Sequence, residues 1–200
     1  METRKEQIIQ AAIKRFGHFG YQKTTLSELA DDLHITKANL YYYYADKLAI
    51  FKDVLRAIVE EVFMNEQVII AAYEGGFMQT FFAVLDARAA MHKKYVMFQT
   101  HEMEEVVKGG GLKDVMKEIS DKDVQSIHSL ITKGIESGEI ALKDPVDASN
   151  KIAEILRSIS IAHKLEDYLT HLPNPEKIDS VLVCQKQMLE FIFEGKFLTR

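Results

Sequence analysis

Proline is almost absent from this chain, which limits what the chain can fold into. All three prolines lie after residue 140, so nothing in the first 140 residues interrupts long helices. Valine and isoleucine recur at spacings of three and four residues and do not alternate with polar residues, a pattern typical of helices. With 47% hydrophobic residues, the 200-residue chain can bury the core of one large domain or two small ones. The sequence predicts an all-α fold.

Local signals place the first helices. An apolar stripe predicts a helix over about 3–18, ended by a glycine-containing segment, "GHFG". Thr25 and Glu28 form a capping box at the start of a second, short helix. Thr36 is a good N-cap for a third short helix. The N-terminal region is therefore expected to contain three helices.

Asp46 marks the expected domain boundary. It caps a much longer apolar-periodic stretch, so we assign 1–46 to a small N-terminal domain and 47–200 to a larger one. In the larger domain, helical patterns cover approximately residues 77–90, 92–107, 112–137, 145–170 and 175–194.

Composition points to a cytoplasmic protein. Cys184 is the only cysteine, which excludes an internal disulfide framework. The N-terminal segment is charged and amphipathic, with no apolar leader, and no window reaches the length of a membrane span. The net charge of −5 is unevenly distributed, because residues 1–50 hold seven Lys/Arg against six Asp/Glu.

Residues 25–44 have the spacing of a helix-turn-helix. The second short helix begins at Lys37 and follows a tight turn through His34, and in this motif it enters the DNA major groove. If Leu40 and Tyr44 face the core, the opposite arc displays a polar, aromatic surface. That arc contains Lys37, Ala38, Asn39, Tyr41, Tyr42 and Tyr43. Its phenols can bind phosphate and Asn39 can pair with a base edge.

Lys37 and Lys47 each stand at the first position of an expected helix. The helix dipole disfavours a cation there, whereas a bound phosphate would favour it. The alternative is that the tyrosines cover an apolar surface and the lysines only keep that surface soluble.

The N-terminal segment resembles the DNA-binding domain of TetR-family transcriptional regulators. That family's pattern is met here by "IIQAAIKRF", "GYQKTT", "ELA" and "LYYYYADK", over about residues 4–51. The chain departs from the pattern at His34, where the family usually has glycine, and at Tyr44, where it usually has phenylalanine. Histidine tolerates the left-handed turn conformation.

The resemblance implies a helix-turn-helix DNA-binding domain at 1–46 and a ligand-binding and dimerisation domain at 47–200. It implies a homodimeric, DNA-binding repressor that binds a palindromic operator and releases it when a small molecule binds. By the same resemblance, the long helix after Asp46 connects the ligand cavity to the DNA-reading helices. The residues expected to approach DNA are Thr25, Lys37, Ala38, Asn39, Tyr41, Tyr42, Tyr43 and Lys47. Tyr41 and Lys47 are assigned to the backbone, and Lys37, Ala38, Asn39 and Tyr42 to base discrimination.

Two further surfaces are assigned in the larger domain. Apolar residues spread too widely for one buried stripe favour a four-helix dimer interface, against the alternative of a central helix in a monomer. The assigned interface residues are Ile152, Ile155, Ile159, Val181, Met188 and Ile192. Segments rich in Phe, Met and Tyr favour an apolar ligand pocket, although such stripes are more often simple packing. The assigned pocket residues are Phe77, Phe81, Met91, Tyr95, Phe98, His101 and Glu102.

No other chemistry is expected. His163, Asp167 and His171 are spaced at i, i+4 and i+8, but one helix cannot complete a metal site, so neither a metal nor a cofactor is predicted. No acid–base pair stands out, and a buried, inert thiol is the default for Cys184. The competing hypothesis is a helical binding protein or small enzyme whose tyrosine helix lines a substrate site.

Overall fold

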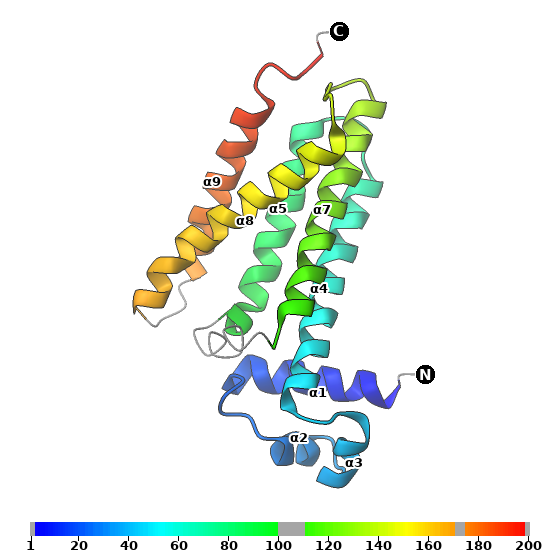
Figure 1. The fold of residues 1–200 in the computed structure, drawn as a ribbon, viewed down its shortest axis with the longest axis vertical. Coiled ribbons are helices and arrows are strands. Elements are labelled where there is room, and N and C mark those ends of the chain that lie inside the picture. Colours follow the sequence, from blue (N-terminus) through cyan, green and yellow to red (C-terminus); the bar gives the residue numbers. More distant parts are fainter. Residues whose placement is uncertain (1–2, 100–110, 171–174, 199–200) are drawn as a thin grey trace. The chain divides into compact units, whose positions relative to one another are not determined.

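A computed structural model describes residues 3–99, 111–170 and 175–198, and within them the regular structure is helical (Figure 1). The elements are α1 (Arg4–Phe19), α2 (Leu26–Asp32), α3 (Lys37–Tyr43), α4 (Lys47–Ala71), α5 (Phe77–Lys94), η1 (Val96–Gln99), α7 (Lys113–Glu136), α8 (Pro145–Thr170) and α9 (Pro175–Phe193). The only strand-like pairing in the described part of the chain is an isolated bridge between Ile140 and Phe197. The predicted all-α class is confirmed.

The chain divides into two compact units. The first consists of Met1–Glu60 and Tyr95–Lys117, and the second of Glu61–Lys94 and Glu118–Arg200. The first unit thus contains all of the expected domain 1–46, together with the start of α4 and a segment from the middle of the chain. None of the described helices is long and apolar enough to cross a membrane.

In the first unit, α1 packs against α2 and η1, and α2 packs against α3 (Figure 1). Its core is closed by aromatic rings from distant parts of the chain. Phe16 and Phe51 meet edge to face with ring centroids 5.6 Å apart, and Phe98 stacks on Phe51 at 6.2 Å. Each ring therefore stabilises the position of α1 against the first turns of α4.

The predicted helix starts of this unit are confirmed. Thr25 and Glu28 form the reciprocal capping box, and the Thr36 hydroxyl accepts from the backbone N–H of Asn39. Asp46 Oδ1 accepts from the N–H of Ala49 at 2.7 Å and so caps α4. His34 has a φ of 53°, which confirms that it adopts the left-handed turn conformation.

One predicted helix boundary is wrong. The sequence patterns suggested separate helices over 77–90 and 92–107, but α5 continues to Lys94 and is followed by the short η1. Residues 100–110 lie outside the described residues. Because α5 ends at Lys94, Tyr95 and Phe98 do not share a helical face with Met91.

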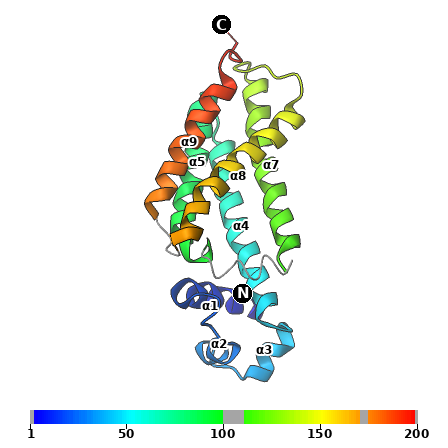
Figure 2. The ribbon, with the colours of Figure 1, turned by 60° about the vertical axis from the view of Figure 1, so that its left-hand side comes forward.

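In the second unit, α9 lies along α5 and α8 (Figure 2). Phe77, Phe81 and Phe193 are fully buried in its core, and the rings of Phe77 and Phe193 meet edge to face at 4.8 Å. Leucine and isoleucine side chains from α7, α8 and α9 complete this core. This packing explains the strong helical periodicity of the larger domain.

Candidate nucleic-acid interface

The short helix α3 is oriented by two buried side chains, one in its middle and one directly after its end. Leu40 is buried on its inner side, and Tyr44, the residue after the helix, is also buried. The Tyr44 hydroxyl donates to Asp53 Oδ2 at 3.0 Å, and the Lys5 ammonium lies 5.5 Å from its ring centroid. Burial, followed by the bond to Asp53, raises the pKa of Tyr44 well above its ordinary value. The prediction that Tyr44 belongs to the core is confirmed.

The opposite side of α3 is open to solvent. Lys37, Ala38 and Asn39 are exposed, and the exposed fractions are 48% for Tyr41 and 83% for Tyr42. Tyr43 is half-buried. The structure therefore collects the expected base-reading residues on one face of one helix, the arrangement that a major groove accepts.

The side chains on this face contact one another. The rings of Tyr42 and Tyr43 meet edge to face at 5.0 Å with an interplanar angle of 87°. The Lys37 ammonium lies 5.9 Å from the centroid of the Tyr41 ring. These contacts limit the rotamers of large exposed side chains, so the surface is partly ordered before any partner binds.

Two acidic residues of α2, the helix that packs against α3, are paired within the unit. Arg15 of α1 donates to both carboxylate oxygens of Asp32 and lies 3.4 Å from Glu28. The bond from Arg15 lowers the pKa of Asp32 below its ordinary value. Bonds from Thr25 are the largest cause of a lowered pKa at Glu28. The guanidinium thus neutralises carboxylates that would repel a phosphate backbone.

Thr25 and Lys47, two further residues expected to approach DNA, already have partners within the first unit. The Thr25 hydroxyl donates to Glu28 Oε2 at 2.7 Å while it caps α2. The Lys47 ammonium donates to the backbone carbonyls of Tyr21, Gln22 and Thr24 at 2.9, 3.4 and 2.9 Å. These carbonyls have no local signal in the sequence, because they lie more than 20 residues before Lys47, so only the helix dipole could be considered there.

The five expected pocket residues that the structure describes are divided between the two units. Phe77 and Phe81 belong to the packed core of the second unit, where Met91 is also buried. Tyr95 and Phe98 belong to the first unit, and their rings lie 5.9 Å apart. His101 and Glu102 lie outside the described residues.

The six expected interface residues lie on the inner side or the flanks of α8 and α9. Ile152 is buried in the core, and Ile192 packs against that core. Ile155, Ile159, Val181 and Met188 are half-buried. The large apolar side chains that face outward are instead Val183 and Phe191, which are 55% and 72% exposed.

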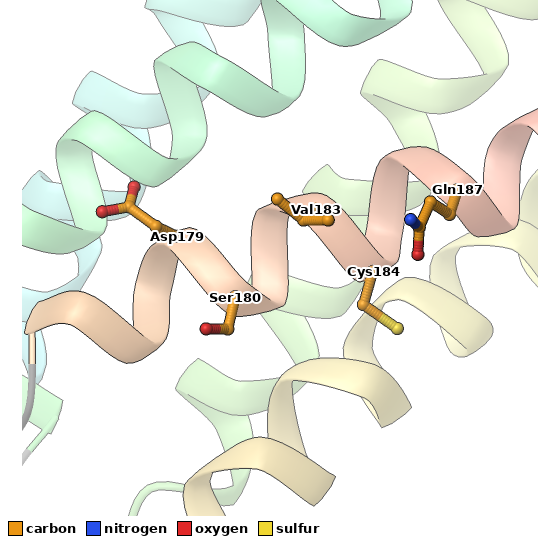
Figure 3. Close-up of a pocket in the computed structure, with 5 residues that line it drawn as sticks. All are labelled: Asp179, Ser180, Val183, Cys184 and Gln187. Atoms are coloured by element: carbon orange, nitrogen blue, oxygen red, sulfur yellow. The ribbon is translucent and has the colours of Figure 1, made fainter.

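The outward surface of α9, which carries Val183, borders a surface hollow of about 380 Å³ (Figure 3). Its lining residues are Asp179, Ser180, Val183, Cys184 and Gln187, all from this one helix. Cys184 is half-buried and forms no disulfide. Helical period places residues 180, 184, 187 and 191 along one line of the helix, but it does not say that this line faces outward, so the sequence analysis missed it.

The described residues contain no cluster of three His, Cys, Asp or Glu side chains with the geometry of a metal site. Of the three residues considered at the sequence level, His163 has its ring nitrogen 2.9 Å from the Ile159 carbonyl oxygen. The side chain of Asp167 and all of His171 lie outside the described residues.

Comparison with known proteins identifies the N-terminal segment. Residues 8–54 match the family described as "Bacterial regulatory proteins, tetR family". The chain is 24% identical over 145 residues to the uncharacterized HTH-type transcriptional regulator YhgD of Bacillus subtilis, covering 71% of this chain and 74% of YhgD. It is 39% identical over 59 residues to IcaR of Staphylococcus epidermidis, a negative transcriptional regulator of the icaADBC biofilm operon. That match covers 30% of each protein.

The fold has counterparts among solved structures. A transcriptional regulator from Cytophaga hutchinsonii superposes with a TM-score of 0.83 at 22% sequence identity. The superposition covers 99% of this chain and 100% of the other. The fold similarity thus extends over the whole chain, whereas the tetR-family match covers only residues 8–54.

Proposed function

We propose that this chain, which is a TetR-family transcriptional regulator, is a repressor that binds a palindromic operator as a homodimer and leaves it when a small molecule binds. IcaR, which is similar to this chain over 59 residues, is described as a negative regulator, and this supports repression over activation. A protein that acts on genomic DNA in this way works in the cytoplasm.

The observation that carries the proposal is the exposed face of α3. Asn39 and Tyr42 project from it beside Lys37, while Leu40 and Tyr44 fix its inner side. An amide can pair with adenine in the major groove, and an exposed phenol ring can lie on a thymine methyl group. We assign Lys37, Ala38, Asn39 and Tyr42 to base discrimination, place the Lys37 ammonium also beside a phosphate at the start of α3, and assign Thr25, Tyr41 and Tyr43 to backbone contacts.

The homodimer is proposed through the outward surface of α8 and α9. Val183 and Phe191 of α9 and Ile161 of α8 expose apolar side chains that water solvates poorly. A second copy, related by a two-fold axis, would cover this surface and form a four-helix bundle. Two copies of α3 set roughly 34–36 Å apart then read successive major grooves.

The effector is proposed to be a largely apolar small molecule bound in the second unit. If it favours a conformer that DNA does not bind, effector and operator weaken each other's binding by the same factor. Its identity is best sought by screening compounds for release of a bound duplex.

DNA binding is tested by fluorescence anisotropy with a random-sequence duplex between about 50 and 200 mM salt. We expect affinity to fall steeply with salt, because bound lysines release counterions from phosphates. A helical enzyme or a metabolite-binding protein would show no such slope. Selection from a duplex pool should then give a palindrome. Asn39→Ala should change the selected sequence, whereas Tyr41→Phe should weaken all duplexes alike.

Homodimerisation is tested by light scattering of two matched variants. Val183→Glu places a charge in the proposed interface and should yield monomers. Val68→Glu changes the same residue type at a comparably exposed site on α4, 67% against 55%, and should leave the dimer intact. A monomeric wild-type protein, or equal behaviour of the two variants, would exclude the α9 surface as the interface.

A further inference from the structure

Lys47 and Lys37 occupy the same position in their helices but have different surroundings. Each is the first residue of a helix, directly after the residue whose side chain caps it. From the contacts of Lys47 we infer that it is a positioning residue that holds the loop before α2 in place, and that it is not a phosphate ligand. The inference rests on the proposed DNA binding.

The ammonium group of Lys47 has as many carbonyl acceptors around it as it has N–H bonds. An ammonium group has three N–H bonds, and Nζ lies within hydrogen-bonding distance of three carbonyl oxygens, those of Tyr21, Gln22 and Thr24. The Tyr21 ring covers another side, with its centroid 4.3 Å from Nζ. To bind a phosphate, the Lys47 ammonium would have to break one of these hydrogen bonds, and the released carbonyl would lose its charged donor.

The three carbonyls belong to the segment that leads into α2. They lie in the loop between α1 and α2, directly before Thr25, the N-cap of α2. The loop is also held by the buried Thr24 hydroxyl, which donates to the Gly20 carbonyl at 2.9 Å. Tyr21 packs edge to face on Phe51 of α4 at 4.8 Å. Lys47 therefore ties the entry of α2 to the first turn of α4.

The position of this loop affects the DNA-reading face of α3. Helix α2 packs against α3, so a displaced α2 would tilt the face that carries Asn39 and Tyr42. The cation at the start of α4 also opposes the helix dipole, and the three carbonyls compensate for this. By contrast, Lys37 is exposed, and its described contact is with the ring of Tyr41.

Two methionine variants separate the roles, because methionine keeps an unbranched apolar stem and removes the charge. Each lost contact between a lysine and a phosphate reduces the slope of log affinity against log salt by about 0.9. Lys37→Met should therefore reduce the slope by about that amount for each subunit. Its Tm should stay within about 1 °C of wild type. Lys47→Met should lower Tm by about 5 °C. At 15 °C, where the Lys47→Met variant stays folded, its affinity for DNA should be about tenfold lower than that of wild type at every salt concentration. Its salt slope should change by less than half of the change that Lys37→Met causes.

Several results would overturn the inference. A Lys47→Met slope that falls as much as that of Lys37→Met would make Lys47 a phosphate contact. An unchanged Tm would show that the carbonyl contacts contribute little. A lowered Tm of Lys47→Met with wild-type affinity for DNA would show that Lys47 stabilises the fold but does not position the DNA-reading face. If wild type binds no DNA at all, the proposed function fails, while the Tm comparison still tests the carbonyl contacts.

Lysine acylation followed by mass spectrometry gives an answer even if the Lys47→Met variant does not fold. In the wild-type protein, Lys47 should react much more slowly than Lys37, because carbonyls and the Tyr21 ring enclose its nitrogen. Added duplex DNA should protect Lys37 and leave the rate at Lys47 unchanged. Rapid labelling of Lys47, or its protection by DNA, contradicts the inference.

Discussion

The hydroxyl of Tyr44 donates a hydrogen bond to Oδ2 of Asp53 at 3.0 Å, and this bond links the end of α3 to α4. Oδ1 of Asp53 accepts from Arg56, which also donates to Asp114 in the first turn of α7. A run of polar contacts thus leads from the candidate DNA-reading helix to α7 within one compact unit. The phenylalanine that TetR-family proteins usually have at this position could not make the first of these contacts.

Tyr44→Phe should lower the free energy of unfolding by about 1 kcal/mol, because the ring stays packed and only one hydrogen bond is lost. Asp53 keeps its bond to Arg56, which limits the loss. Urea denaturation measures the change. Tyr42→Phe is the control, since that hydroxyl is on an 83% exposed side chain and its removal should cost less than about 0.5 kcal/mol. Equal effects would mean that the Asp53 bond contributes nothing.

Arg88→Met should destabilise the protein by about 3–5 kcal/mol. The guanidinium bonds both carboxylate oxygens of Glu66, whose side chain is only 3% exposed, and lies 3.4 Å from Asp123. Without Arg88, two carboxylates remain at a largely dry site. The double variant Arg88→Met/Glu66→Gln should recover part of the loss in denaturant titrations.

The matched control breaks an exposed ion pair. Lys94→Met removes the partner of Glu61, and both side chains are more than 40% exposed. Its cost should stay below about 1 kcal/mol. If Arg88→Met lost no more stability than Lys94→Met, the buried ion pairs of Arg88 would contribute no more to stability than the exposed pair.

Two glycine substitutions inside helices should change stability in opposite directions. A Cβ at Gly134 would lie 2.5 Å from the ring of the buried Phe77, so Gly134→Ala should cost about 1–3 kcal/mol. A Cβ at Gly17 would make an ordinary 3.6 Å contact with Phe98. Gly17→Ala should therefore stabilise α1 by about 0.5–1 kcal/mol. Thermal unfolding of both variants tests the packing of both units, and stabilisation by Gly134→Ala would contradict the described core.

Glu139 should make stability depend on pH. Its carboxylate accepts from the Tyr73 hydroxyl and from the N–H groups of Phe77 and Gly76, which lowers its pKa below the ordinary 4.5. Because the folded-state pKa is the lower one, this stabilisation is present above about pH 4.5 and is lost as the pH falls through the folded-state value. The stability difference between wild type and Glu139→Gln should be largest near pH 7 and shrink below pH 4.5.

Asp123 provides the comparison of opposite sign. Burial is the largest cause of its raised pKa, with Arg88 and Arg157 acting against it. Its contribution to stability therefore decreases as the pH rises above the ordinary value of 3.8. Over that range, Asp123→Asn should gain stability relative to wild type. The same trend in both variants would contradict the assigned environments.

Local chemistry explains which parts of the structure could be predicted. Thr25, Thr36 and Asp46 cap helices through bonds that span only three residues, so the sequence reveals them directly. The end of α5 also had a local signal, the basic residues of its last turn, which the apolar periodicity concealed. The exposed arc of α3 follows from the helical period alone.

Contacts between distant segments could not be predicted in the same way. The carbonyl partners of Lys47 lie more than 20 residues before it, and Phe98 meets Phe51 from beyond α5. Likewise, helical period separates a buried face from an exposed one but does not say which intermediate positions turn outward. For that reason the sequence favoured Val181 and Met188, whereas the structure exposes Val183 and Phe191.

The first unit includes a second stretch of the chain, Tyr95–Lys117. Its DNA-reading helices therefore cannot be transplanted as one continuous N-terminal segment. A chimera that joined residues 1–60 to a foreign sensor would strip Phe98 from Phe51 and Asp114 from Lys52 and Arg56. Grafts between relatives should therefore carry both stretches together, so that the donor's own residues continue to meet one another.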